Sequence, residues 1–249
     1  MSFCQSSNLG FTYSNGLHAL RGVSFEVTRG ECVAIVGPSG CGKSTLLRVL
    51  AGLLKPTAGT VTVNDMVVTG PVKGTGLMFQ DPALLPWRTV AENIQLPYEL
   101  GAGAPANTTH DVNSLVTLVG LEGFEAALPR ELSGGMGQRT ALARALALHP
   151  PLLLMDEPFG ALDALTREGL TAQLQTVWQD LDTTVIQVTH NIAEAVFLAD
   201  RVLVMSARPG HIVGEVRIGF ARPRNWSMQN SPAFGDAMAA IRGLLTGGG

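Results

Sequence analysis

The feature that most constrains the fold is a glycine-rich octapeptide between two apolar stretches. Residues 37–44 read Gly-Pro-Ser-Gly-Cys-Gly-Lys-Ser and match the pattern GxxxxGK[ST]. The valine-rich residues 32–36 predict a buried strand before it, and the leucine-rich residues 44–54 predict an amphipathic helix after it. Because a phosphate-binding loop joins a strand to a helix in this order, the pattern favours an α/β fold.

The chemistry expected of this loop is the binding of a polyphosphate. Glycines allow the backbone N–H groups to turn inward, and the helix N-terminus adds a favourable dipole. Lys43 supplies a positive charge, and the Ser44 hydroxyl is a ligand for Mg²⁺. A chance glycine-rich turn is the alternative, which the strand and helix on either side disfavour. The residues expected to contact the ligand are Gly37, Pro38, Ser39, Gly40, Cys41, Gly42, Lys43, Ser44 and Thr45.

Short apolar runs alternate with longer helical patterns along the chain, which is typical of a largely parallel sheet. Strands are predicted at residues 23–27, 32–36, 61–63, 76–79, 152–155, 184–188 and 201–205, with a last hairpin over 212–218. Strand patterns stop between residues 87 and 150, where helices are predicted at 112–119 and 134–148 and a solvent loop at 100–109. We therefore expect a core in two parts, 1–87 and 150–249, the second with a C-terminal extension, and a helical subdomain at 88–149.

Composition excludes several classes of protein. The chain has 249 residues, of which 46% are hydrophobic, so it can bury a substantial core. Its formal charge of -3 provides no general excess of cations for a nucleic-acid backbone. Its three cysteines are an odd number at irregular spacing, which suits a reducing compartment such as the cytoplasm. Without a secretory-type start or an apolar run of about 18 residues, the chain is expected neither to enter nor to cross a membrane by itself.

Two adjacent acids follow the apolar run at residues 152–155. Asp156 and Glu157 precede Pro158 and stand at the carboxyl end of a predicted parallel strand, where such folds bind ligands. Asp156 is expected to hold Mg²⁺, and Glu157 to polarise an attacking water as a general base. The alternative is a solvated strand end, which the phosphate-binding loop upstream makes less favoured.

The segment Leu-Ser-Gly-Gly-Met at residues 132–136 resembles the LSGGQ signature of ATP-binding-cassette proteins. Ser133 can cap the helix that follows, and the N–H groups of Gly134 and Gly135 can donate hydrogen bonds to phosphate oxygens. The resemblance implies a P-loop NTPase (RecA-like) core with a mainly parallel sheet, an N-terminal antiparallel β part and an inserted helical subdomain. It also implies two head-to-tail copies that hold two ATP molecules between them.

Four further positions match the family in chain order. Tyr13 resembles the aromatic residue that stacks on adenine, and Gln80 resembles the glutamine that reaches Mg²⁺ and the attacking water. Asp163 resembles the acid that communicates across the dimer, and His190 resembles the histidine that contacts the γ-phosphate. Packing is the alternative for Tyr13, and a structural role is the alternative for His190.

The chain departs from the family pattern at two positions. Met136 replaces the consensus glutamine, and Gly137 places a flexible residue in the first helical turn, at a cost of about 1 kcal/mol relative to alanine. Both departures concern the tuning of the helix, because Ser133, Gly134 and Gly135 are intact. Cys41, inside the glycine-rich loop, is either a reactive thiol or, as we favour, a small packed residue.

Residues 76–88 and 188–200, and a C-terminal region with Arg222 and Arg224, resemble the nitrate, sulfonate and taurine importer class. This resemblance implies an ATPase that uses ATP and Mg²⁺ and works as a homodimer or with a paired ATPase subunit. Its partners would be an integral membrane permease and, indirectly, a substrate-binding protein. The chain itself would lie at the cytoplasmic face of the inner or plasma membrane.

The apolar residues after Gln80 have two possible roles. Leu84, Leu85 and Trp87 are expected either to receive a permease helix or to pack in the helical subdomain. The alternative functions are an export or lipid-handling transporter ATPase, a non-transport cassette ATPase and a simple P-loop kinase.

Overall fold

The computed structural model describes residues 2–101 and 112–247, which form two compact units. The first unit comprises Met1–Val72 and Thr184–Gly249, and the second comprises Lys73–Thr183. The three-part division at 1–87, 88–149 and 150–249 stays a prediction. Most of the predicted loop at 100–109 lies outside the described residues. In the described parts of the chain, no helix combines the length and apolar composition that a membrane span requires.

The first unit contains an antiparallel sheet in the order β2-β1-β4-β5. Its strands are β1 (Ser2–Thr12), β2 (His18–Thr28), β4 (Ala58–Val63) and β5 (Met66–Val67). β1 pairs with both β2 and β4, so it lies inside this sheet. The expected N-terminal antiparallel part is therefore confirmed, although β1 and β5 were not among the predicted strands.

The parallel strands of the first unit are β3 (Cys32–Val36), β8 (Thr184–Thr189) and β9 (Arg201–Met205), with β3 between the other two. β10 (Ile212–Arg217) pairs antiparallel with β9. Residues 212–217 are therefore one strand, and the hairpin predicted within 212–218 is instead formed by β9 and β10. All five residues of β3 and all six of β8 are buried. This is the pattern of strands covered on both faces, and it explains their continuous apolar sequence.

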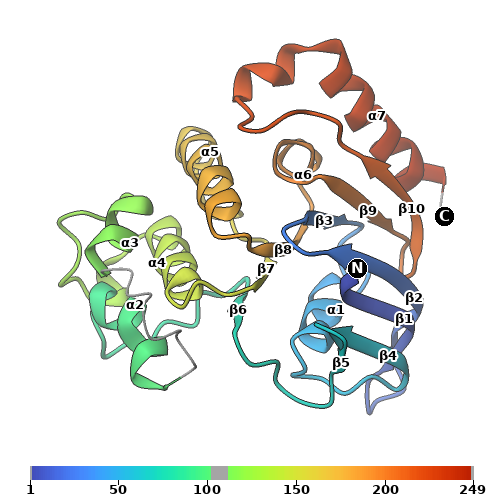
Figure 1. Ribbon diagram of the computed structural model, residues 1–249, viewed down its shortest axis with the longest axis horizontal. Helices are drawn as coiled ribbons and strands as arrows, with labels where there is room; N and C mark the ends of the chain where they lie inside the picture. Colours follow the sequence, from blue (N-terminus) through green and yellow to red (C-terminus); the bar gives the residue numbers. More distant parts are fainter. Residues whose placement is uncertain (1, 102–111, 248–249) are drawn as a thin grey trace. The chain divides into compact units, whose positions relative to one another are not determined.

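Four helices complete the first unit. α1 (Lys43–Leu50) contacts both β2 and β8, and α6 (Ile192–Leu198) contacts β3, β8 and β9. The C-terminal segment forms η2 (Trp226–Asn230) and α7 (Pro232–Gly247), and α7 packs on α6, β9 and β10 (Figure 1). α1 ends at Leu50, four residues before the predicted end, because Gly52 takes a left-handed conformation with φ of 73°. Leu53 lies beyond the helix end, within the predicted range 44–54, and is 46% exposed.

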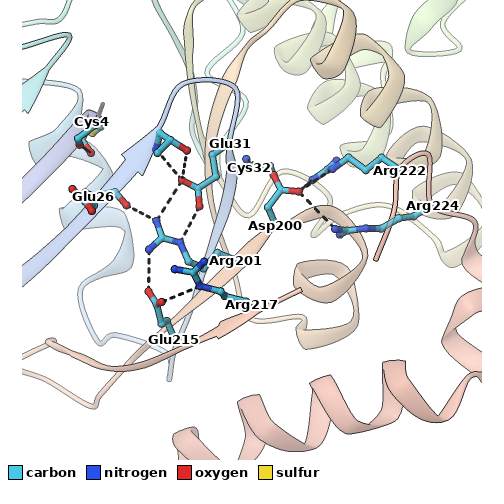
Figure 2. Close-up of polar contacts among 12 residues, drawn as sticks. Cys4, Glu26, Glu31, Cys32, Asp200, Arg201, Glu215, Arg217, Arg222 and Arg224 are labelled. Atoms are coloured by element: carbon cyan, nitrogen blue, oxygen red, sulfur yellow. Dashed lines mark hydrogen bonds and ion pairs between the residues drawn. The ribbon is translucent and has the colours of Figure 1, made fainter. Parts of the chain in front are cut away.

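An ion-pair network joins β9 to its neighbours in the first unit. The Arg201 guanidinium donates to Glu31 at 2.9 Å and to Glu215 at 2.9 Å, so one cation links β9 to β10 and to the turn before β3 (Figure 2). Hydrogen bonds to both carboxylates favour the charged form and outweigh burial, so the pKa of Arg201 is raised.

The C-terminal segment is attached by a second group of charges. Asp200 accepts hydrogen bonds from the backbone N–H of Cys32 at 2.9 Å and from Arg222 at 3.0 Å (Figure 2). Arg224 is buried and donates to the carbonyls of Val196, Phe197 and Ala199 at the end of α6. Burial lowers its pKa to about 10. The two arginines of the Arg-Pro-Arg sequence therefore attach this segment to the end of α6 and to Asp200, directly before β9.

The second unit consists of one pair of parallel strands and a group of helices. β6 (Thr75–Met78) pairs with β7 (Leu152–Asp156), and residues between them form α2 (Val90–Glu99), α3 (Val112–Leu118), η1 (Pro129–Glu131) and α4 (Gly134–Leu146). α2 packs on α3 and α4, and these three helices are green to yellow-green in Figure 1. α5 (Ala164–Asp180) follows β7. The helical insertion is thus confirmed.

Candidate active site

The glycine-rich loop turns directly from β3 into α1, and two of its glycines are sterically required. A Cβ at Gly37 would lie 2.9 Å from Cys41 Sγ, and a Cβ at Gly42 would lie 2.8 Å from the carbonyl oxygen of Ala19. Gly42 is also the N-cap of α1 with φ of 110°, and no side chain caps the helix. The first-turn N–H groups therefore donate no hydrogen bond to a capping side chain.

The Lys43 ammonium lies inside this loop. Lys43 is only 7% exposed, and its Nζ donates to the carbonyls of Gly37 at 2.8 Å and Pro38 at 3.0 Å. The first turn of α1 contains no acidic residue. A buried ammonium beside a positive helix N-terminus makes the loop attractive to an anion, so the residues present fit a polyphosphate.

Tyr13 lies beside the start of α1. Its hydroxyl is 2.8 Å from Thr45 Oγ1, and its ring makes an edge contact with Phe11, with centroids 4.9 Å apart. The half-buried Tyr13 is therefore held against the helix that carries Lys43 and Ser44.

His190 follows the carboxyl end of β8, as the loop follows the carboxyl end of the neighbouring strand β3. In the parallel pairing of β3 and β8, Val36 is opposite Thr189, so Gly37 and His190 each follow the last residue of neighbouring strands. His190 is exposed, unlike the buried strand before it. The first unit thus brings together Tyr13, the loop at residues 37–45 and His190.

The acidic strand end of the second unit lies beside Gln80. The pairing of β6 with β7 places Met78 opposite Met155, so Gln80 and Glu157 follow adjacent strand ends. Gln80 Nε2 donates to Glu157 Oε2 at 3.4 Å. Asp156 is 5% exposed, and Glu157 adopts φ of 49°, a left-handed conformation that is uncommon for a residue with a side chain. This backbone conformation sets the direction in which the Glu157 side chain leaves the main chain.

The signature segment begins α4 as a regularly capped helix. The Ser133 hydroxyl accepts a hydrogen bond from the N–H of Met136 at 3.2 Å, which is the N-cap arrangement. Ser133 and Gly134 are exposed, so their polar groups are accessible at the helix start. Gly137 is buried and donates to the Ser133 carbonyl at 3.0 Å, so the helix is continuous through both departures from the consensus.

Asp163 is the N-cap of α5. Its carboxylate accepts a hydrogen bond from the N–H of Thr166 at 3.0 Å, and this bond lowers the pKa of Asp163 below its ordinary value. Asp163 is therefore held as an exposed anion at neutral pH. The second unit thus contains Gln80, Asp156, Glu157, the signature residues 133–135 and Asp163.

Gln138 has a place in this arrangement that the sequence reasoning missed. Its Oε1 accepts from the N–H of Ala161 at 2.9 Å, and its Nε2 donates to the carbonyl of Glu157 at 3.5 Å. The available signal was a glutamine five residues after Ser133, on the helix face that is buried.

Comparison with known proteins identifies the family. Residues 20–160 match the ABC transporter family. The chain is 43% identical over 235 residues to the nitrate import ATP-binding protein of Synechocystis, covering 92% of this chain and 88% of that one. It is 43% identical over 219 residues to the taurine import ATP-binding protein of Pelagibacter ubique, covering 87% and 83%. An uncharacterized ABC transporter ATP-binding protein of Methanocaldococcus jannaschii is 49% identical over 212 residues, covering 85% and 79%.

Solved structures agree with this assignment. A dimeric ATP-binding cassette in a post-hydrolysis state, bound to ADP and Pi, superposes with a TM-score of 0.78 at 32% identity and covers 87% of this chain and 100% of its own. The P-loop NTPase fold is thereby confirmed. The chain belongs to the ABC transporter family. Within that family it is an ATP-binding and ATP-hydrolysing subunit of a transporter.

Proposed function

We propose that two copies of this chain hydrolyse ATP to drive import of a small solute through a separate membrane permease. We assign the solute to the class that includes nitrate, sulfonates and taurine. The observation that carries this proposal is the similarity, over most of the chain, to nitrate and taurine import ATP-binding proteins at 43% identity. A permease partner would hold the subunit at the cytoplasmic face of the inner or plasma membrane.

In the proposed mechanism, the loop at residues 37–45 binds the phosphates of ATP through its N–H groups and the Lys43 ammonium. Tyr13 stacks on the adenine, and His190 donates a hydrogen bond to the γ-phosphate. Hydroxyl, amide and carboxylate oxygens are the hard ligands that suit Mg²⁺. The residues that would hold it are Ser44, Gln80 and Asp156. Bound Mg²⁺ offsets the negative charge of the phosphates.

Glu157 acts as the general base in this proposal. Its carboxylate orients a water molecule and accepts a proton as the water oxygen bonds to the γ-phosphorus. The bond from that phosphorus to the β-phosphate oxygen breaks, and ADP and phosphate are the products. Gln80 orients the carboxylate, as its 3.4 Å contact with Glu157 supports.

The second copy completes the site through its signature segment. Ser133, Gly134 and Gly135 of one copy would contact the ATP that is held by the other, and Asp163 would communicate between them. The exposed Ser133 and Gly134 at the start of α4 support this role. The similar dimeric cassette supports the pairing. Loss of the γ-phosphate would then let the copies separate.

The permease contact is proposed at the segment after Gln80. Asn93 is fully buried and holds this segment, because its Oδ1 accepts from the N–H of Leu85 at 2.8 Å and its Nδ2 donates to the carbonyl of Arg88 at 3.0 Å. Trp87 is 72% exposed, whereas Leu84 and Leu85 are half-buried. An exposed tryptophan on an anchored segment supports a contact with a partner helix over core packing.

The base assignment is tested with Glu157→Gln. We expect turnover to be abolished while ATP still drives dimer formation, because the amide keeps the shape of the side chain and cannot accept the proton. Steady-state ATPase assays and size-exclusion chromatography with ATP measure the two properties. Glu122→Gln, at an exposed position, is the control with unchanged turnover. Normal hydrolysis by Glu157→Gln would refute the assignment.

The transport proposal is tested on the chain purified with its natural membrane partner and placed in liposomes. Nitrate, taurine and an alkanesulfonate are each supplied with the cognate binding protein, and ATPase stimulation is measured. We expect one of these solutes to stimulate turnover and to move from the compartment that contains the binding protein into the compartment that contains the ATPase. Stimulation by a lipid, with movement in the other direction, would favour an export function instead.

A further inference from the structure

Gln138 is a buried glutamine that bridges two segments of the second unit. It is 5% exposed, in the second turn of α4. Its Oε1 accepts from the N–H of Ala161 at 2.9 Å, and its Nε2 donates to the carbonyl of Glu157 at 3.5 Å. Because one partner is a donor and the other an acceptor, the two contacts define the orientation of the amide.

The segment that Gln138 spans is the turn between Glu157 and Ala161. The N–H of Gly160 donates to the Glu157 carbonyl at 3.2 Å, so this carbonyl is shared between the turn and Gln138. Glu157 itself has φ of 49°. A residue in this uncommon conformation persists when the surrounding structure holds it, and Gln138 supplies contacts at both ends of the turn.

The start of α4 is packed tightly against the same turn. A Cβ at Gly135 would lie 3.0 Å from Leu162 Cδ2 and 3.3 Å from the carbonyl oxygen of Ala161. A Cβ at Gly134 would lie 3.7 Å from Ala161 Cβ, which is ordinary contact. Gly135 and the residues after Glu157 therefore leave little room to move against each other.

We propose that Gln138 is a positioning residue that holds the main chain of Glu157 in register with the start of α4. This inference rests on the proposed function, in which Glu157 serves the ATP of its own copy and Ser133 serves that of the other. Gln138 then couples the two ATP sites, because a shift of α4 toward the partner's ATP is transmitted to the base. Gln80 contacts the Glu157 carboxylate, whereas Gln138 acts on the backbone.

The first test is Gln138→Met, which keeps side-chain length and removes both hydrogen bonds. We expect kcat for ATP hydrolysis to fall about 10-fold to 100-fold, because a small misplacement of the base is costly. KM for ATP should change by less than about threefold, since the phosphate-binding loop is untouched. A general loss of folded protein would instead lower the active fraction in proportion to the loss of structure.

The matched control is Gln175→Met, the same exchange at a fully buried glutamine of α5 in the same unit. Its melting temperature should fall by about as much as that of Gln138→Met. Its kcat, counted per folded molecule, should stay at the wild-type value. Equal kcat losses in the two variants would overturn the positioning role. So would a normal kcat for Gln138→Met.

A second variant decides the matter if Gln138→Met does not fold. Gln138→Glu keeps the acceptor for Ala161 but places a carboxylate oxygen against the Glu157 carbonyl, so a fall in kcat is again expected.

Amide hydrogen exchange in the wild-type chain tests the contact without any variant. Ala161 is exposed, yet its N–H should exchange about 100-fold more slowly than in an unstructured chain. Unprotected exchange would overturn the proposal even if neither variant folds.

The two proposals fail in distinguishable ways. If Glu157→Gln forms no ATP-dependent dimer or hydrolyses ATP normally, the proposed function fails. If Glu157→Gln behaves as expected while Gln138→Met turns over normally, only the role of Gln138 is wrong. If the wild-type Ala161 amide is unprotected, the coupling through Gln138 is likewise wrong and the base assignment is unaffected.

Discussion

Two glycine-rich helix starts, those of α1 and α4, differ in how their first-turn N–H groups are treated. α1 begins after Gly42, which is left-handed and has no capping side chain. α4 begins after Ser133, whose extended backbone and hydroxyl cap the N–H of Met136. In addition, α1 has the buried Lys43 in its first turn, whereas the first turn of α4 has no charged residue.

Under the proposed function, this difference would separate a primary anion site from an auxiliary one. The start of α1 relies on a ligand to complete its hydrogen bonding, because neither a capping side chain nor an acidic residue occupies it. The start of α4 is partly satisfied by its own serine and can therefore form before it meets a phosphate. ATP binding should depend mainly on α1, and hydrolysis should depend on both.

The largest expected effect follows from removing the charge at α1. Lys43→Met should lower ATP turnover about 100-fold to 1,000-fold, because a preorganised cation at the phosphates is lost. ATP affinity should fall as well, and both are measured by ATPase assay and calorimetric titration. Lys55→Met, at an exposed lysine, is the control with unchanged values. Normal ATP binding by Lys43→Met would break the comparison.

The next effect concerns the α4 cap. Ser133→Ala should lower turnover about 10-fold to 100-fold, with ATP binding to the single chain retained, because the hydroxyl would serve the partner's ATP. It should also cost about 1 kcal/mol of stability as a lost cap. Thr89→Ala removes the corresponding cap from α2. If both variants lose turnover equally, Ser133 acts through helix stability alone.

A smaller effect distinguishes the two signature glycines. Gly135→Ala should destabilise the chain by about 1–3 kcal/mol, because its methyl group would press on Leu162 and the carbonyl of Ala161. Gly134→Ala has ordinary contacts and should be neutral or stabilising by up to about 1 kcal/mol. Urea unfolding measures both. Equal stability of the two variants would contradict the tight packing at Gly135.

The smallest expected effect is the absence of cysteine labelling in the first unit. Burial raises the pKa of both Cys4 and Cys32 to about 12, so few thiolates exist at pH 8. Cys41, between the loop glycines, is 1% exposed. Iodoacetamide at pH 8, followed by mass spectrometry, should label all three in urea and none in the folded chain. ATP-sensitive labelling of Cys41 would instead reveal a reactive thiol beside Lys43.

The local parts of the fold were predictable from the sequence. β3 and β9 have the predicted bounds, and the predicted helices at 112–119 and 134–148 correspond to α3 and α4 within two residues at each end. β1 was missed because the polar residues Gln5, Ser6, Ser7 and Asn8 interrupt its apolar pattern. Its register with β2 and β4 also contains several irregularities, which move side chains from one face to the other.

The glycine-rich loop, the acidic strand end and the signature segment could be recognised from the sequence by itself. Each is a contiguous run whose expected chemistry follows from glycine, lysine, serine or acidic residues next to a strand or helix. Only the tertiary structure decided that Tyr13 bonds to Thr45, that Gln80 meets Glu157 and that Gln138 joins α4 to the turn after Glu157. The partners in these contacts are 19 to 77 residues apart in the sequence. No local sequence pattern encodes which distant partner a polar side chain will find.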